Sequence, residues 1–238
     1  MRSGTSPLVI AHRGASSIEL ENSLAAFRAA APQGADGVEL DIHATTDGEL
    51  IVHHDETIDG THIAQSTART IAALRLRNGE PVPTLAQALA AIAPRLQVFI
   101  EVKTLDPRWD AHLFEAMDRG PNPKGYAIHS FDHRIVRRLA DQRRARGSEG
   151  LRCGVLSSSY PVRPLTALDD AAATILWQER TVTDDLLVRT LHDALRSVFV
   201  WTVDEPADLT RFVALGVDGL CTNVPARARQ AVDASRAA

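Results

Sequence analysis

Short apolar runs alternate with longer stretches of helical spacing along most of the chain. Apolar runs of about four to eight residues indicate buried strands, while apolar positions three and four residues apart indicate helices. The resulting strand-then-helix units repeat about eight times, which is typical of a (β/α)₈ barrel of the TIM type. The predicted strands are 8–11, 37–43, 96–102, 126–130, 151–156, 172–177, 198–203 and 219–222, and the predicted helices are 23–31, 84–92, 109–117, 132–146, 184–195, 206–215 and 226–234.

One segment interrupts this alternation. Residues 50–53 resume an extended run after a turn at 46–48, which predicts a hairpin-like extension of the second strand. Residues 56–81 are polar and lack clear periodicity, so we expect a short insertion over the barrel mouth, with one helix near 71–76. The whole chain, 1–238, is therefore predicted to form one barrel domain. A doubly wound open sheet is the alternative, although the sequence lacks a G-x-G-x-x-G turn and a P-loop.

Composition and charge narrow the classes of protein. Hydrophobic residues make up 45% of the chain and charged residues 24%, which supports a large core and argues against disorder. The net charge of −4 argues against nucleic acid as the main partner. We expect a cytoplasmic protein without stable membrane insertion, because no apolar run suits a signal peptide or a membrane span. Cys153 and Cys221 are predicted to be buried free thiols, and a homo-oligomer is left open.

Three acidic residues fall on predicted strands. Glu39 and Asp41 are two residues apart, so both side chains point to one side of the strand, opposite its apolar residues and into the barrel. Two carboxylates held together away from water usually share a proton or bind a hard cation such as Mg²⁺ or Ca²⁺. Glu101, near the end of another predicted strand, would supply a third oxygen ligand. Salt bridges on the exposed face of an edge strand are the alternative.

Two histidines and two cations lie at predicted strand ends as well. His12 and His54 carry imidazoles that can take and give one proton in a single reaction cycle. Arg13 and Lys103 suit a phosphate or a carboxylate, or they neutralise the acidic pair. Together these groups favour phosphoryl transfer or phosphodiester cleavage. The other histidines, with His129 the least certain of them, are predicted to have no role.

Short motifs follow one another in a fixed order along nearly the whole chain. They include His12-Arg13-Gly14, Glu21-Asn22-Ser23, Glu39-Leu40-Asp41, Asp47-Gly48, His54-Asp55, Ile100-Glu101-Val102-Lys103, Val200-Trp201-Thr202-Val203 and Thr222-Asn223-x-Pro225. This series resembles the glycerophosphodiester phosphodiesterase family. The resemblance implies a TIM-type barrel and a metal-dependent hydrolase that cleaves a glycerophosphodiester to glycerol 3-phosphate and an alcohol. It also implies a place in lipid or glycerol metabolism.

The resemblance implies a role for each matching residue. His12 and His54 would be the general base and the general acid, and Glu39, Asp41 and Glu101 would bind Mg²⁺ or Ca²⁺. Arg13 and Lys103 would hold the phosphate, and Glu21 and Asn22 would support the site. Trp201 would form an apolar wall of the pocket, with core packing as its alternative. Leu20, Ser23 and the short insertion depart from the family pattern, and the insertion leaves the alcohol open. Lysophospholipase D-type hydrolysis and a non-catalytic barrel that binds an anion are the alternative functions.

Overall fold

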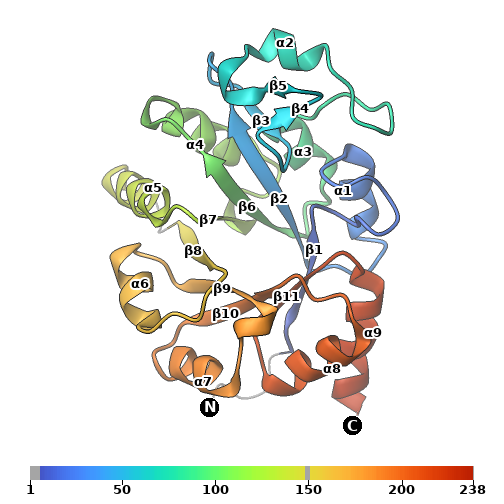
Figure 1. Cartoon of the computed structure of the whole chain (residues 1–238), viewed down its shortest axis with the longest axis vertical. Coiled ribbons are helices and arrows are strands. Elements are labelled where there is room, and N and C mark those ends of the chain that lie inside the picture. The colour runs from blue at the N-terminus through green and yellow to red at the C-terminus, as the bar shows by residue number, and fades with distance from the viewer. Residues whose placement is uncertain (1–5, 148–150, 238) are drawn as a thin grey trace.

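Eight parallel strands close into a barrel in the computed structural model, which describes residues 6–147 and 151–237 (Figure 1). β1 (Leu8–His12) pairs with β2 (Gly37–Ala44) on one side and with β11 (Gly219–Thr222) on the other, which closes the sheet. From β2 round to β11 the strands are β6 (Gln97–Thr104), β7 (Tyr126–Ser130), β8 (Arg152–Ser157), β9 (Ile175–Glu179) and β10 (Ser197–Trp201). The predicted TIM-type barrel is confirmed, and the open sheet is excluded.

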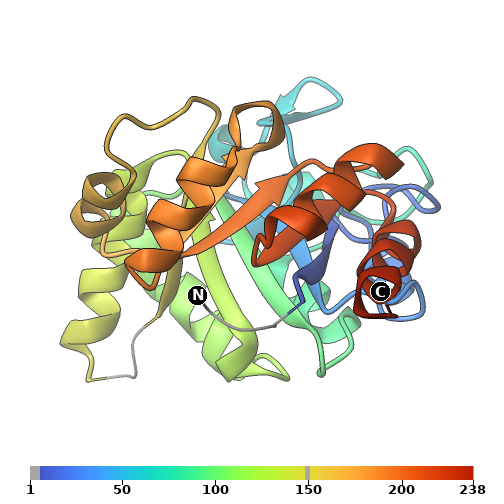
Figure 2. The same cartoon turned by 90° about the horizontal axis from the view of Figure 1, so that it is seen from below.

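Helices connect the strands and surround the barrel in both views (Figure 1 and Figure 2). Ser23 caps the first helix by accepting a hydrogen bond from the backbone N–H of Ala26. No helix within 6–147 and 151–237 is long and apolar enough to cross a membrane. The helices are α1 (Leu24–Ala30), α3 (Leu85–Ala91), α4 (Asp110–Arg119), α5 (His133–Ala145), α6 (Pro164–Asp170), α7 (Asp185–Asp193), α8 (Pro206–Leu215) and α9 (Pro225–Ala237).

The segment between β2 and α3 forms a small layer of its own, at the top of Figure 1. β3 (Leu50–Val52) runs antiparallel to β2, which confirms the predicted hairpin-like extension. β4 (Thr57–Ile58) and β5 (Thr61–His62) then form a two-stranded sheet, followed by α2 (Ala68–Ala72). The predicted helix at 71–76 is wrong by several residues, because the side chain of Thr67 caps the helix and sets its start.

An aromatic layer fills the interior of the barrel. Phe99 meets Trp177 edge to face with 5.3 Å between ring centroids, and Trp177 meets Phe199 in the same way at 5.0 Å. Glycines on neighbouring strands make room for these rings: a Cβ at Gly154 would lie 2.6 Å from Trp177, and one at Gly219 would lie 2.8 Å from Phe199. Because this layer fills the interior, the polar residues that point inward gather at the carboxyl ends of the strands.

Candidate active site

The carboxyl ends of the strands surround a cavity of about 60 Å³ that collects most of the predicted site residues. Strand register explains the convergence, since His12 lies beside Glu39 across β1 and β2. Asp41 likewise lies beside Glu101 across β2 and β6. The cavity is lined by His12, Arg13, Glu39, His54, Glu101, Lys103, His129, Phe131, Leu156, Trp177, Trp201 and Cys221.

Glu39 and Glu101 are buried carboxylates that the surroundings do not fully neutralise. Burial, followed by the charges of Asp41 and Glu101, raises the pKa of Glu39 well above its usual range. Burial, followed by the charge of Asp41, raises the pKa of Glu101 to about 7. Both groups therefore favour the protonated form unless a cation beside them stabilises the ionised form, and this is the condition that predicts a metal site.

Asp41 is in a different electrostatic situation from these two glutamates. Its Oδ1 lies 3.0 Å from the Nζ of Lys103, and its Oδ2 lies 3.3 Å from the Nε of Arg13. Asn22 also donates a hydrogen bond of 2.8 Å to Oδ2. Burial opposes ionisation of Asp41, but Lys103 and Arg13 outweigh it and hold its pKa at about 2. Asp41 is thus a paired anion, and it does not line the cavity.

Arg13 connects the first motif to the rest of the site. Its backbone N–H donates to Glu39 at 3.1 Å, and its NH1 donates to both carboxylate oxygens of Glu21 at 3.0 Å. Arg13 and Asn22 both adopt positive φ angles, of 56° and 55°, in the tight turns that follow β1. Glu21 and Asn22 thus lie where the prediction places supporting residues, in contact with Arg13 and Asp41.

The two predicted acid-base histidines line the same cavity but have different surroundings. The Nδ1 of His12 lies 2.8 Å from the Oδ1 of Asn223. Burial, followed by the charge of Arg13, lowers the pKa of His12 to about 4. His54 is partly exposed, and its Nδ1 donates a hydrogen bond of 2.7 Å to Asp55. The Nε2 of His43 donates to the carbonyl of His54, which holds the segment after β3 in place.

His129 was predicted to have no role, but it lines the cavity of the site. It lies beside Glu101 in the register of β6 and β7, and its ring stacks on Trp177 with 4.2 Å between centroids. Its Nε2 is 3.9 Å from the Oε1 of Glu39, while its buried Nδ1 has no hydrogen-bond partner. Burial lowers the pKa of His129 to about 3, so the ring is neutral and able to bind a metal.

A buried cluster of Glu39, Glu101 and His129 could hold a metal ion. One ligand atom from each of these residues lies within 4.8 Å of the others. Two carboxylates and one neutral imidazole suit a divalent cation, and the raised pKa values of both glutamates fit such a site. The cluster shares two members with the predicted ligands and has His129 where the prediction has Asp41.

Trp201 and Phe131 form an apolar rim at one side of the cavity. The two rings meet edge to face with 5.6 Å between centroids, and 49% of Phe131 is exposed to solvent. Trp201 lies at the end of β10, where it lines the cavity and also packs against the aromatic layer, so its contacts agree with both predicted alternatives. Phe131 was not predicted as a site residue, because a single aromatic residue after a strand is not distinguishable from a core residue.

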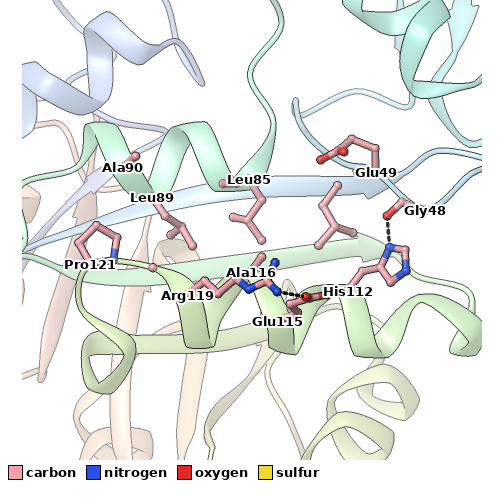
Figure 3. A pocket seen from close by; sticks show the side chains of 13 residues that line it. Gly48, Glu49, Leu85, Leu89, Ala90, His112, Glu115, Ala116, Arg119 and Pro121 are labelled. Atoms are coloured by element: carbon pink, nitrogen blue, oxygen red, sulfur yellow. Dashed lines mark hydrogen bonds and ion pairs between the residues drawn. The ribbon is translucent and has the colours of Figure 1, made fainter.

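Two of the further cavities among the described residues adjoin β3 or the segment after it. One, of about 380 Å³, lies outside the barrel between α3 and α4, where Leu85 and Leu89 face Ala116 and the Nδ1 of His112 donates to the carbonyl of Gly48 (Figure 3). None of the predicted site residues lines it. The other, of about 260 Å³, is bounded by the segment after β3, by the insertion and by Glu21, Asn22, His53, His54 and Asp55.

Residues 12–227 match the glycerophosphoryl diester phosphodiesterase family. The chain belongs to this family. The matched range runs from the first residue of the His-Arg-Gly motif into the final helix, α9, so it contains every residue that lines the cavity and all of the barrel strands except the first four residues of β1. The prediction of an enzyme of the glycerophosphodiester phosphodiesterase family is thereby confirmed.

Relatives and solved structures of the family extend over nearly the whole chain. A glycerophosphodiester phosphodiesterase of Caldanaerobacter subterraneus subsp. tengcongensis is 32% identical, with 92% of this chain and 94% of that protein covered. A crystal structure of a glycerophosphodiester phosphodiesterase from Parabacteroides distasonis aligns with a TM-score of 0.83 at 26% identity, covering 99% of this chain and 100% of the other. An Oleispira antarctica phosphodiesterase in complex with the product sn-glycerol-3-phosphate has the same fold, with a TM-score of 0.84 at 22% identity and coverage of 96% and 97%.

Proposed function

We propose that this protein hydrolyses glycerophosphodiesters to glycerol 3-phosphate and a free alcohol, with the help of a divalent cation. One observation carries the proposal: a single cavity in which two histidines, two carboxylates and two cationic side chains converge. Phosphodiester cleavage needs a base, an acid and positive charge around the phosphate, and this cavity offers all three. Membership of the family supports the same activity. The six residues are His12, His54, Glu39, Glu101, Arg13 and Lys103.

The two histidines are proposed to transfer the protons. Because burial and the charge of Arg13 lower the pKa of His12 to about 4, this imidazole is neutral at pH 7 and can accept a proton. His12 would deprotonate the attacking group, which is either water or the 2-hydroxyl of the glycerol. His54, whose ring is oriented by the hydrogen bond from its Nδ1 to Asp55, would protonate the departing alcohol oxygen.

The cationic side chains are proposed to bind the phosphate and stabilise its developing charge. Lys103 lies within 3.0 Å of Asp41 and 2.7 Å of Glu101, and Arg13 is held by Glu21 and Asp41, so both positive charges are fixed before substrate binds. Fixed charges stabilise a transition state without the cost of reorganisation. A divalent cation held by the buried carboxylates would add positive charge at the phosphate oxygens.

Two ligand sets compete for this cation, and the geometry favours one of them. The predicted set is Glu39, Asp41 and Glu101, whereas the cluster in the structure contains His129 in place of Asp41. We propose Mg²⁺ or Ca²⁺ for the first set, while an imidazole ligand would shift the preference toward Mn²⁺. Calorimetric titration with Mn²⁺ separates the sets: H129A should weaken binding at least about 10-fold and more than D41N does. Weaker Mn²⁺ binding by D41N than by H129A would favour Glu39, Asp41 and Glu101 as the ligands.

The alcohol is proposed to occupy the cavity of about 260 Å³, because His54 lines both this cavity and the one that holds the other site residues. Carboxylates and the guanidinium groups of Arg75 and Arg77 surround it, which suits a small polar alcohol. The lysophospholipid alternative has one observation in its favour: the exposed ring of Phe131 beside Trp201 offers an apolar surface for an acyl chain.

A substrate panel tests the proposal. Glycerophosphocholine, glycerophosphoethanolamine and glycerophosphoglycerol should release glycerol 3-phosphate in the presence of Mg²⁺, Ca²⁺ or Mn²⁺, and EDTA should abolish the activity. Faster cleavage of lysophosphatidylcholine would favour the lysophospholipid alternative. Tight binding of inorganic phosphate without turnover under any of the three cations would favour the non-catalytic barrel, and full activity in EDTA would remove the cation from the scheme.

Further properties stay predictions from the sequence. They are a single domain over residues 1–238, a cytoplasmic location without stable membrane insertion, a role in lipid or glycerol metabolism, and an oligomeric state that is left open. Fractionation of cells and light scattering of the purified protein would test the location and the oligomeric state.

A further inference from the structure

A chain of hydrogen bonds connects His12 to two residues that do not line the cavity. The Nδ1 of His12 lies 2.8 Å from the Oδ1 of Asn223, and the Nδ2 of Asn223 donates to the Oδ2 of Asp204 at 2.7 Å. These residues come from three adjacent strand ends, because His12 ends β1, Asn223 follows β11 and Asp204 follows β10. Asn223 belongs to the last of the sequence motifs, whereas Asp204 belongs to none of them.

We propose that Asp204 and Asn223 are positioning residues that fix the tautomer of His12. The inference rests on the proposed function, in which His12 is the general base. In a neutral imidazole one nitrogen carries the proton and the other carries the lone pair. A general base needs the lone pair on the nitrogen that faces the substrate, so the nitrogen that faces away must hold the proton.

Asp204 sets the direction of the hydrogen bonds between His12, Asn223 and Asp204, because an ionised carboxylate only accepts hydrogen bonds. Its Oδ1 accepts from the backbone N–H of Asn223 at 2.8 Å and from the hydroxyl of Thr222 at 3.0 Å, which fixes the orientation of the carboxylate. Its Oδ2 must then face the NH₂ group of Asn223, so the amide oxygen of Asn223 faces His12. That oxygen can only accept, so the Nδ1 of His12 must donate and Nε2 keeps the lone pair.

Ser16 contacts the same side of the Asn223 amide. Its hydroxyl lies 2.8 Å from the amide oxygen of Asn223 and 2.8 Å from the backbone carbonyl of His12. The hydroxyl therefore contacts two acceptors and ties the turn after β1 to the end of β11. The amide of Asn223 is held by Asp204 on its nitrogen side and is contacted by His12 and Ser16 on its oxygen side.

The substitution D204N reverses the polarity with little change in shape. The new amide would keep its oxygen toward the backbone N–H of Asn223 and turn its NH₂ group toward the NH₂ group of Asn223. Two donors cannot pair, so the amide of Asn223 would rotate and present its NH₂ group to His12. The Nδ1 of His12 would then accept, the proton would move to Nε2, and the base would lose its lone pair toward the substrate. We expect kcat to fall by about 10² to 10⁴ with KM changed far less.

The double substitution D204N/N223D should restore the tautomer. A carboxylate at position 223 accepts both from the Nδ1 of His12 and from the amide at position 204, so every hydrogen bond is satisfied again. A purely structural role for the chain would not predict this recovery. D218N is the matched control, because Asp218 accepts hydrogen bonds from His192 at 2.9 Å and from the backbone N–H of Val198 at 2.8 Å, away from the cavity. It should leave kcat unchanged.

Nitrogen-15 NMR of protein labelled at histidine reads the tautomer directly, with H12Q used to assign the His12 signals. The wild type and D204N/N223D should show a protonated Nδ1, and D204N should show a protonated Nε2. If D204N or the double variant does not fold, N223A should give a mixture of the two tautomers. A His12 in D204N that keeps its proton on Nδ1, or a D204N enzyme with kcat within about twofold of the wild type, would overturn the proposal. The NMR result stands even if no glycerophosphodiester is cleaved, so failure of the proposed function is distinguishable.

Discussion

Glu101 tests whether the cavity is as desolvated as its geometry indicates. Burial, followed by the charge of Asp41, raises the pKa of Glu101 from 4.5 to about 7. A carboxyl whose pKa is higher in the folded state stabilises the fold while it is protonated, and this contribution is lost as the pH rises through about 7. Metal-free protein should therefore lose stability through Glu101 between pH 5 and pH 8.

The substitution E101Q removes this titration, because glutamine resembles the protonated carboxyl in shape. One pKa unit corresponds to about 1.4 kcal/mol, so the rise in the pKa of Glu101 is worth about 2 to 3 kcal/mol over this pH range. The free energy of unfolding of E101Q minus that of the wild type should increase by this amount from pH 5 to pH 8. For a chain of this size the increase corresponds to roughly 5 to 10 °C in Tm.

The assay is thermal or urea unfolding of both proteins in EDTA at pH 5, 6, 7 and 8. The comparison with E101Q is needed because two histidines also make the stability depend on pH. Burial lowers the pKa values of His12 and His129, so the folded protein loses stability as the pH falls below their ordinary value of 6.5, and it does so in both proteins. E115Q, which removes an exposed carboxylate from α4, is the matched control. Parallel curves for E101Q and the wild type would refute the reasoning, since they would mean that water solvates Glu101 in the folded protein.

Three further substitutions give separate tests. H54A should lower kcat by about 10² to 10⁴ without a change in Tm, and near-normal turnover would exclude His54 as the acid. W201A should raise KM about 2- to 10-fold, because it removes the edge-to-face contact with Phe131. W201F should recover most of this loss. An unchanged KM in W201A would indicate that Trp201 only packs in the core. G154A should destabilise the protein by about 1 to 3 kcal/mol in urea unfolding, because its Cβ would lie 2.6 Å from Trp177, and wild-type stability would show that the aromatic layer can shift.

The barrel could be predicted because most of its strands are apolar on both faces and stand out from the polar turns. Boundaries were less accurate where a polar residue continues a strand. The predicted strand 172–177 stops at Trp177, whereas β9 continues through Gln178, whose buried amide donates to the carbonyls of Ser157 and Ser159. The helix α6 was missed, because its seven residues contain only two large apolar positions, Leu165 and Leu168, and a single pair is too short to show a helical pattern.

Two features of the sequence predicted the site: the alternation of side chains between the two faces of a strand, and the order of the motifs. The alternation within 37–43 placed Glu39 in the interior, and the structure has its side chain 3% exposed there. The alternation along a strand could not identify His129 as a site residue. Its place in the site depends on the pairing of β7 with β6, which puts it next to Glu101. The partner of His12 was missed for the same reason, since Asn223 is distant in the sequence and adjacent in the barrel.

The charges of the site explain why two of its three carboxylates resist ionisation while the third does not. Three acidic residues and two basic ones leave one negative charge in excess. Asp41 contacts both cations, with Lys103 at 3.0 Å and Arg13 at 3.3 Å, whereas Glu101 shares Lys103 at 2.7 Å. Glu39 and Glu101 are left with raised pKa values and room for two positive charges. A divalent cation would turn the excess to one positive charge, which is the complement of the single negative charge of a phosphodiester. Selectivity for diesters over doubly charged monoesters would follow from this balance, because a monoester would leave an unneutralised charge in a buried cavity.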